Sequence, residues 1–197
     1  MNQVDDVFET HVTVRCTSEP ELDRLGAWAA ERELKVTTIV LARGLTPVQP
    51  MLTLRGRTGH PAVVAALRAA GFEPARVKVE TVPWTTEPAG PGGGYYEHHV
   101  KLALPAAYDR AALEDLVVPH GAHVSWNARR ELPGPGGRHE RFVTQRHAGP
   151  LDAAGRACEA LIDVLLDEGY ELLSQEQEFV VSDSDLSWDE GWLEEAV

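Results

Sequence analysis

The chain carries Phe8-Glu9-Thr10-His11-Val12-Thr13-Val14 and repeats the same order of residue types in Tyr96-Glu97-His98-His99-Val100-Lys101-Leu102. Both stretches read aromatic, Glu, any residue, His, Val, any residue, aliphatic. This alternation predicts a β-strand with its Glu and its His on one face and its apolar residues on the other. A polar pair that is present in both halves of the chain is therefore the strongest functional lead in the sequence.

The pattern around these stretches predicts the same order of elements twice. Residues 1–84 read as strand, helix, strand, strand, helix, strand, and residues 95–183 read the same way. Residues 85–94 are rich in Pro and Gly and predict a linker, while residues 184–197 form an acidic tail with two Trp. An internal duplication is further indicated by matching pieces in the same order in both halves: Ala42-Arg43 with Ala128-Arg129, Thr53-x-Arg55 with Thr144-x-Arg146, and Gly71-Phe72-Glu73 with Gly169-Tyr170-Glu171.

This order of elements resembles tandem ferredoxin-like domains over nearly the whole chain. The expected fold class is α+β: two tandem ferredoxin-like βαββαβ repeats, each an antiparallel sheet with helices on one face and an open face opposite. The Glu-x-His-Val, Ala-Arg-Arg and Phe-Val-Thr-x-Arg pieces are also similar to a bacterial family of such repeats. Because Ile39, Leu41 and Met51 would face water on the first repeat, we expect the two open faces to pack together around His11 and His99.

Composition limits the possible partners and location. A formal net charge of −13 argues against nucleic acid, whose phosphates require clustered Lys and Arg. No N-terminal apolar run resembles a signal peptide, and no stretch approaches the roughly 20 apolar residues of a membrane span. Cys16 and Cys158 lack the spacing of a metal or redox motif. We expect a cytoplasmic protein that has neither nucleic acid nor a membrane as a partner.

The leading functional hypothesis is a site for a small anionic molecule on the open face of the second repeat. Arginine guanidinium groups bind phosphate or carboxylate through paired hydrogen bonds. A histidine beside such an anion can act as a general acid or base. The expected catalytic residues are His99, Glu97 and His11, and the expected ligand-binding residues are Asn127, Arg129, Thr144, Arg146, Arg141 and Arg55. The sequence leaves open whether the protein is an enzyme.

A divalent metal is one alternative. His11 and Glu80 in the first repeat, with His99 and Glu178 in the second, place one His on the first strand and one Glu on the last. This resembles the two-His, two-Glu layout of the vicinal oxygen chelate enzymes and implies Zn, Fe, Mn or Ni. The chain departs from that family because a helix is expected between the third and fourth strands of each repeat.

Two further alternatives are a phosphoesterase and a non-catalytic interaction module. His11-Val12-Thr13 is similar to the His-x-Thr motif of two-histidine phosphoesterases, but the corresponding His99-Val100-Lys101 lacks the Thr. The polar faces could also be solvated cross-strand charge ladders of a non-catalytic interaction module. In that case the tail, with Trp188 and Trp192, would pack on the body of the chain or join a homo-oligomer.

Overall fold

Each half of the chain contributes four long strands and two α-helices. The computed structural model describes residues 7–128, 131–132 and 137–193. The first half contains β1 (Phe8–Arg15), α1 (Glu19–Ala30), β2 (Lys35–Leu41), β3 (Val48–Arg55), α2 (His60–Ala69) and β4 (Glu73–Thr81). The second half contains β5 (Tyr95–Pro105), α3 (Arg110–Val117), η2 (Val118–His120), β6 (Ala122–Asn127), β7 (Glu131–Leu132), β8 (Arg138–Ala148), α4 (Leu151–Asp167), β9 (Glu171–Asp183) and η3 (Leu186–Asp189).

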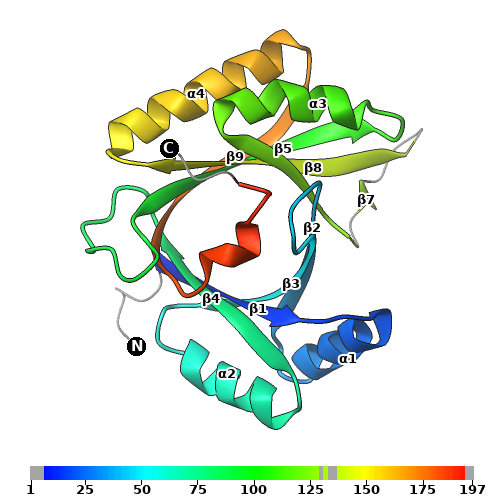
Figure 1. Cartoon of the computed structure of the whole chain (residues 1–197), viewed down its shortest axis with the longest axis vertical. Coiled ribbons are helices and arrows are strands. Elements are labelled where there is room, and N and C mark those ends of the chain that lie inside the picture. Colours follow the sequence, from blue (N-terminus) through cyan, green and yellow to red (C-terminus); the bar gives the residue numbers. More distant parts are fainter. Residues whose placement is uncertain (1–6, 129–130, 133–136, 194–197) are drawn as a thin grey trace.

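The eight long strands form one closed antiparallel barrel, seen end-on in Figure 1. Around the barrel the order is β5-β9-β4-β1-β3-β2-β6-β8, and β8 pairs with β5 again to close the ring. Two pairings join the halves of the chain. At one, β2 meets β6 with Ile39 opposite Asn127 and Leu41 opposite Ser125. At the other, β4 meets β9 with Lys78 opposite Asp183.

The prediction of two tandem ferredoxin-like repeats with open sheets is therefore wrong. In such a fold β2 and β4 would be the free edges of one sheet, and β6 and β9 the free edges of the other. Free edges expose unpaired backbone N–H and C=O groups, and closure into a barrel removes them. Here each of these strands pairs with an edge from the other half. The face that was expected to be open consequently becomes the inner wall of the barrel.

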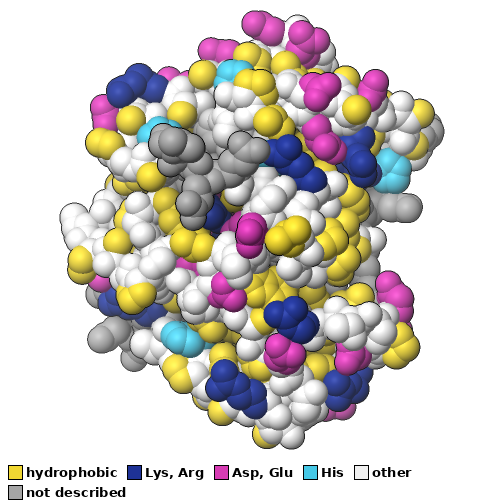
Figure 2. All heavy atoms as spheres, in the orientation of Figure 1, with side chains coloured by type: hydrophobic (Ala, Val, Ile, Leu, Met, Phe, Trp, Pro, Cys, Tyr) yellow, Lys and Arg dark blue, Asp and Glu magenta, His cyan; other side chains and the backbone are white. Residues whose placement is uncertain are grey.

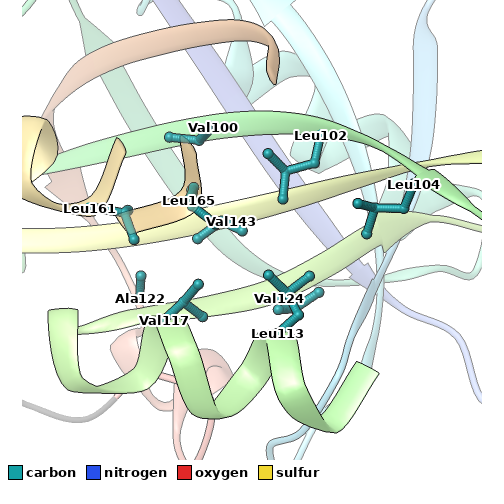
Figure 3. Close-up of a cluster of buried hydrophobic side chains, with 10 residues drawn as sticks. All are labelled: Val100, Leu102, Leu104, Leu113, Val117, Ala122, Val124, Val143, Leu161 and Leu165. Carbon is teal, nitrogen blue, oxygen red and sulfur yellow. The ribbon is translucent and has the colours of Figure 1, made fainter. Parts of the chain in front are cut away.

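The helices cover the outside of the barrel. Figure 1 shows α1 and α2 on one side of the ring and α3 and α4 on the opposite side. Beneath α3 and α4, Val100, Leu102 and Val143 from the strands meet Leu113 and Leu161 from the helices (Figure 3). Burying a side chain of this size contributes about 1.5–3 kcal/mol. Val100 and Leu102 alternate with Glu97, His99 and Lys101 along β5. Packing of these apolar side chains against the helices therefore turns the polar side chains inward.

Local signals fix the ends of the helices. The Asp109 side chain accepts a hydrogen bond from the Ala112 N–H at 3.1 Å and so caps the start of α3. Gly71 and Gly169 follow the ends of α2 and α4 with φ of 76° and 79°, where a residue with a Cβ would be strained. Among the residues that the structure describes, no helix is long and apolar enough to cross a membrane.

The C-terminal segment, which we define as residues 184–193, folds back across the mouth of the barrel. In Figure 1 it lies within the ring of strands, and in Figure 2 protein atoms cover the middle of the ring on the same face. Trp188 and Trp192 are buried. The Trp192 indole donates to the Val124 carbonyl at 3.3 Å, and Gln49 donates to the Trp188 carbonyl at 2.7 Å. Both indoles therefore pack on the body of the chain, which is one of the two arrangements that the sequence predicted for the tail.

Candidate functional site

The barrel encloses a cavity of about 340 Å³, bounded at one end by the C-terminal segment. This volume lies at the lower end of the range for small-molecule sites, which are typically about 300–1,000 Å³. Seven residues that the sequence singled out line the cavity: His11, Glu80, Glu97, His99, Asn127, Thr144 and Glu178. The inner wall of the barrel thus collects side chains from both halves of the chain in one enclosed space.

The first histidine lies in a row formed by three neighbouring strands. The Nδ1 atom of His11 on β1 lies 3.2 Å from the Thr53 hydroxyl on β3. Its Nε2 atom lies 2.8 Å from the Glu80 carboxylate on β4 and 3.3 Å from Glu9. Because a hydrogen bond on each ring nitrogen fixes the plane of the imidazole, His11 is held in one orientation.

The second half builds a similar row. The Nδ1 atom of His99 on β5 lies 3.0 Å from the Thr144 hydroxyl on β8. Its Nε2 atom lies 3.4 Å from the Glu178 carboxylate on β9 and 3.6 Å from Glu97. The interior therefore carries two Thr–His–Glu rows, which we define as the first row (Thr53, His11, Glu80) and the second row (Thr144, His99, Glu178).

Lys78 lies between Glu80 of the first row and Glu97, and it gives the two rows different electrostatic surroundings. Its ammonium lies 2.5 Å from Glu80 and 2.6 Å from Glu97, and Arg146 donates to the other Glu97 oxygen at 2.8 Å. Burial alone would raise the pKa of Glu97, but the charges of Lys78 and Arg146 outweigh burial and hold this pKa far below its ordinary value. Burial likewise opposes ionisation of Glu80, but the charges of Lys78 and His11 hold its pKa well below the usual range. Both groups are therefore fixed carboxylates.

The pair formed by His99 and Glu178 behaves differently. Burial lowers the pKa of His99, but the hydrogen bond to Glu178 and the charge of Glu97 outweigh burial, so the pKa is raised. The pKa of Glu178 is also raised, by burial first and then by the charge of Glu80. Raised pKa values on both partners allow the pair to hold a proton at higher pH than either group would in water. His99 therefore lies beside two carboxyl groups of opposite character: the pKa of Glu97, the expected partner, is lowered, whereas that of Glu178 is raised.

A second ion network attaches the C-terminal segment to the barrel. Arg76 donates from Nε to Asp183 at 2.9 Å and from Nη2 to Asp189 at 2.7 Å. Arg146 also contacts Asp189, and the Tyr95 hydroxyl donates to Asp183 at 2.8 Å. Arg146, which was expected to bind an anionic ligand, is thus already paired with two carboxylates of the chain, Glu97 and Asp189.

Of the six predicted ligand-binding residues, Asn127 and Thr144 are the two among the described residues that line the cavity. The Nε atom of Arg141 donates to the Tyr108 hydroxyl at 2.8 Å, on the helix-covered side of β8. Arg55 is exposed opposite Glu9 and does not line the cavity. Arg129 lies outside the described residues.

The four residues predicted to bind a metal form two pairs, His11 with Glu80 and His99 with Glu178. Across residues 7–128, 131–132 and 137–193, no group of three or more His, Cys, Asp and Glu side chains is arranged to hold a metal ion.

The predicted site residues did not include Arg76, Lys78, Asp189 or Trp192, which line the cavity. Lys78 and Arg76 precede Glu80 by two and four residues on the same strand, so the alternation of side chains places them on the same face. Asp189 and Trp192 carry no such signal, because they reach the cavity only through the path of the C-terminal segment.

The protonation of His99 gives a pH-dependent prediction. Because its pKa is raised, His99 is expected to stay protonated to higher pH than a histidine side chain in water. In the Glu178→Gln variant the ring loses a carboxylate partner, so its pKa is expected to fall. Imidazole ¹³C NMR signals followed against pH measure both values, with a His99→Gln variant for assignment. A His99 pKa that is unchanged in Glu178→Gln contradicts the pairing.

Comparison with known proteins identifies no family for this chain. No protein-family model and no curated protein matches the sequence. Among solved structures, it is similar to the small subunit of acetolactate synthase from Thermotoga maritima, with 11% identity over 88% of this chain and 94% of that chain and a TM-score of 0.33. It is also similar to an unknown protein from Galdieria sulphuraria, with 17% identity over 88% of this chain and 98% of that chain and a TM-score of 0.30. Similarities at this level carry no argument about fold or function.

Proposed function

We propose that the interior of the barrel binds a small molecule and transfers a proton to or from it. In this proposal His99 and Glu178 form the acid–base pair, and the first row positions the molecule from the neighbouring strands. The observation that carries the proposal is the meeting of both Thr–His–Glu rows in one cavity of about 340 Å³.

The difference between the two rows supports proton transfer. Glu80 is fixed as a carboxylate by Lys78, whereas Glu178 has a raised pKa beside a histidine whose pKa is also raised. The surroundings thus push the pKa values of two carboxyl groups, Glu80 and Glu178, apart, which is the usual basis for assigning them different roles in proton transfer. Glu178 is also accessible, since its side chain is 28% exposed while that of Glu80 is 2% exposed.

The rival expectation was an interaction module assembled through the acidic tail. Two features favour binding inside the barrel instead. Trp188 and Trp192 are buried against the chain's own barrel, and Trp192 itself lines the cavity. A site inside the barrel shields a bound molecule from part of the surrounding water, which strengthens the electrostatic interactions made with that molecule.

Met51 offers a direct reporter for binding, because the chain has two methionines, Met1 and Met51, and Met51 lines the cavity. We expect the Met51 methyl signal of protein labelled with ¹³C-methyl methionine to shift, in a saturable way, with some members of a chemically diverse set of small molecules. Two-dimensional methyl NMR measures the shift, and a Met51→Leu variant assigns the signal.

A matched pair of tryptophan variants separates the interior from the outer surface. Thr37→Trp adds an indole to the cavity wall from β2 and is expected to abolish the Met51 shift caused by the binding molecules. Leu166→Trp adds an indole at an exposed position of α4 and is expected to leave the shift unchanged. A Met51 signal that no member of the set perturbs, or one that shifts equally in both variants, contradicts the proposed function.

A further inference from the structure

We infer that the molecule bound in the barrel has an apolar, preferably aromatic, body and a positively charged amine. This inference rests on the proposed function and adds the chemical class of the ligand. It stands on three features of the interior: an apolar wall on one side, a polar wall on the other, and two buried cations, Arg76 and Lys78, that are already paired with carboxylates of the chain.

The apolar wall belongs to one contiguous set of strands. Ile39 and Leu41 from β2, Met51 from β3 and Phe142 from β8 line the cavity, together with Trp192 from the C-terminal segment. Leu41, Trp192 and Leu193 form a buried cluster against which Ile39 packs. Aromatic side chains such as Phe142 and Trp192 offer flat surfaces for a ring and negative π faces for a cation.

The polar wall lies on the other four strands of the barrel. Both histidines, together with Glu80 and Glu178, come from β1, β4, β5 and β9, which are consecutive around the ring. The apolar wall comes from β3, β2 and β8, which lie in the remaining part of the ring with β6. A molecule in the cavity therefore meets these apolar side chains on one side, among polar ones such as Thr37 and Asn127, and the histidines and carboxylates on the other.

Two of the cations that line the cavity, Arg76 and Lys78, have little capacity left for an anion. Arg76, Lys78 and Arg146 each contact two carboxylates of the chain. The Lys101 ammonium lies 5.2 Å from the centroid of the Phe142 ring, and Lys35 is exposed. An incoming phosphate or carboxylate would have to displace buried ion pairs, which leaves buried charges without partners.

The carboxylates, in contrast, outnumber the lysines and arginines around the cavity. Six carboxylates and four cations line the described part of the cavity: Glu9, Glu80, Glu97, Glu176, Glu178 and Asp189 against Lys35, Arg76, Lys78 and Lys101. Glu178 is the carboxylate best placed for a ligand, because it is partly exposed and its His99 contact is long, at 3.4 Å. An ammonium group beside Glu178 would gain a charge-assisted hydrogen bond.

Three compounds of similar size test the charge preference: 2-phenylethylamine as the cation, 2-phenylethanol as the neutral form and 3-phenylpropanoate as the anion. We expect the amine to bind at least about tenfold more tightly than the anion, a difference of about 1.4 kcal/mol. In Glu178→Gln the affinity for the amine is expected to fall about tenfold. Glu168→Gln makes the same change at an exposed position on the outside of the barrel and is expected to leave the affinity unchanged. Isothermal titration calorimetry measures the dissociation constants, and the Met51 methyl signal confirms that binding is internal.

The remaining outcomes separate this inference from the proposed function. Equal binding of the alcohol and the amine, or tighter binding of the anion, overturns the ligand class and leaves binding in the barrel intact. The same conclusion follows if none of the three compounds shifts Met51 while members of the diverse set do. If neither the three compounds nor the diverse set shifts Met51, the proposed function and the ligand class fall together.

Discussion

Replacing Arg76 with alanine is expected to lower the free energy of unfolding by about 3–5 kcal/mol, the usual cost of removing one partner from a buried ion network. Arg76 is 4% exposed and holds Asp183 and Asp189, which are 3% and 4% exposed. Without its guanidinium, Asp183 keeps only the Tyr95 hydroxyl as a side-chain partner among the contacts described above. Urea denaturation followed by tryptophan fluorescence measures the loss.

Arg156→Ala provides the matched control, because Arg156 forms an exposed pair with Asp152 on α4. Such surface pairs contribute roughly 0–1 kcal/mol. The pH dependence gives a second check. Burial raises the pKa of Asp183, but Arg76 outweighs burial and lowers it below the ordinary 3.8, so the stability from this pair is present above that pH and is lost as the pH falls through the lowered value. The difference between the wild type and Arg76→Ala should therefore shrink in acid. A loss below about 1 kcal/mol at neutral pH contradicts the role assigned to Arg76.

Replacing Lys78 with methionine is expected to cost a comparable amount, about 3–5 kcal/mol. Methionine keeps the length of the side chain but leaves Glu80 and Glu97 facing each other without the ammonium between them. Burial lowers the pKa of Lys78, but the two carboxylates outweigh burial and hold it well above its ordinary value, so the lysine is charged at neutral pH. Chemical denaturation at pH 7 measures the change.

A rescue variant distinguishes lost charge balance from lost packing. Adding Glu80→Gln to Lys78→Met removes one of the two stranded carboxylates and is expected to restore part of the stability. Lys35→Met makes the same substitution at an exposed position of the cavity rim and is expected to change the stability by less than about 1 kcal/mol. If the loss in the free energy of unfolding of the double variant equals the sum of the losses of the two single variants, Lys78 and Glu80 are not coupled.

The direction of the side chains could be predicted from the sequence, because alternation along a strand is a local property. The pattern of β1 and β5 put His11, Glu97 and His99 on the face opposite the helices, and the structure has them on the inner wall. The ends of α2 and α4 could also be predicted, since Gly71 and Gly169 mark them in the sequence.

The closure of the barrel could not be predicted in the same way. Which edge strand pairs with which is decided by contacts between residues far apart in the chain, such as Ile39 with Asn127 and Lys78 with Asp183. Ile39, Leu41 and Met51 were interpreted as a surface that needs a second sheet to cover it. The same residues instead form a wall of the closed barrel, where the strands of the other half bend around to face them.

The chemistry of the second row also depends on distant contacts. Glu97 is the nearest carboxylate to His99 in the sequence, but Lys78 and Arg146 hold it as a fixed carboxylate. Glu178, on β9, becomes the partner because its strand lies beside β5. The sequence therefore indicates which residues share a face, whereas the pairing of charges on that face requires the structure.

The most direct measurement is a crystal structure of the protein grown with the molecule that shifts Met51 most strongly. The expected result is a closed ring in which β2 pairs with β6, with the molecule inside it between Phe142 and the His99–Glu178 pair. Density for the molecule on the outer surface, with only water inside the barrel, or strands β2 and β6 that do not pair, would contradict the account.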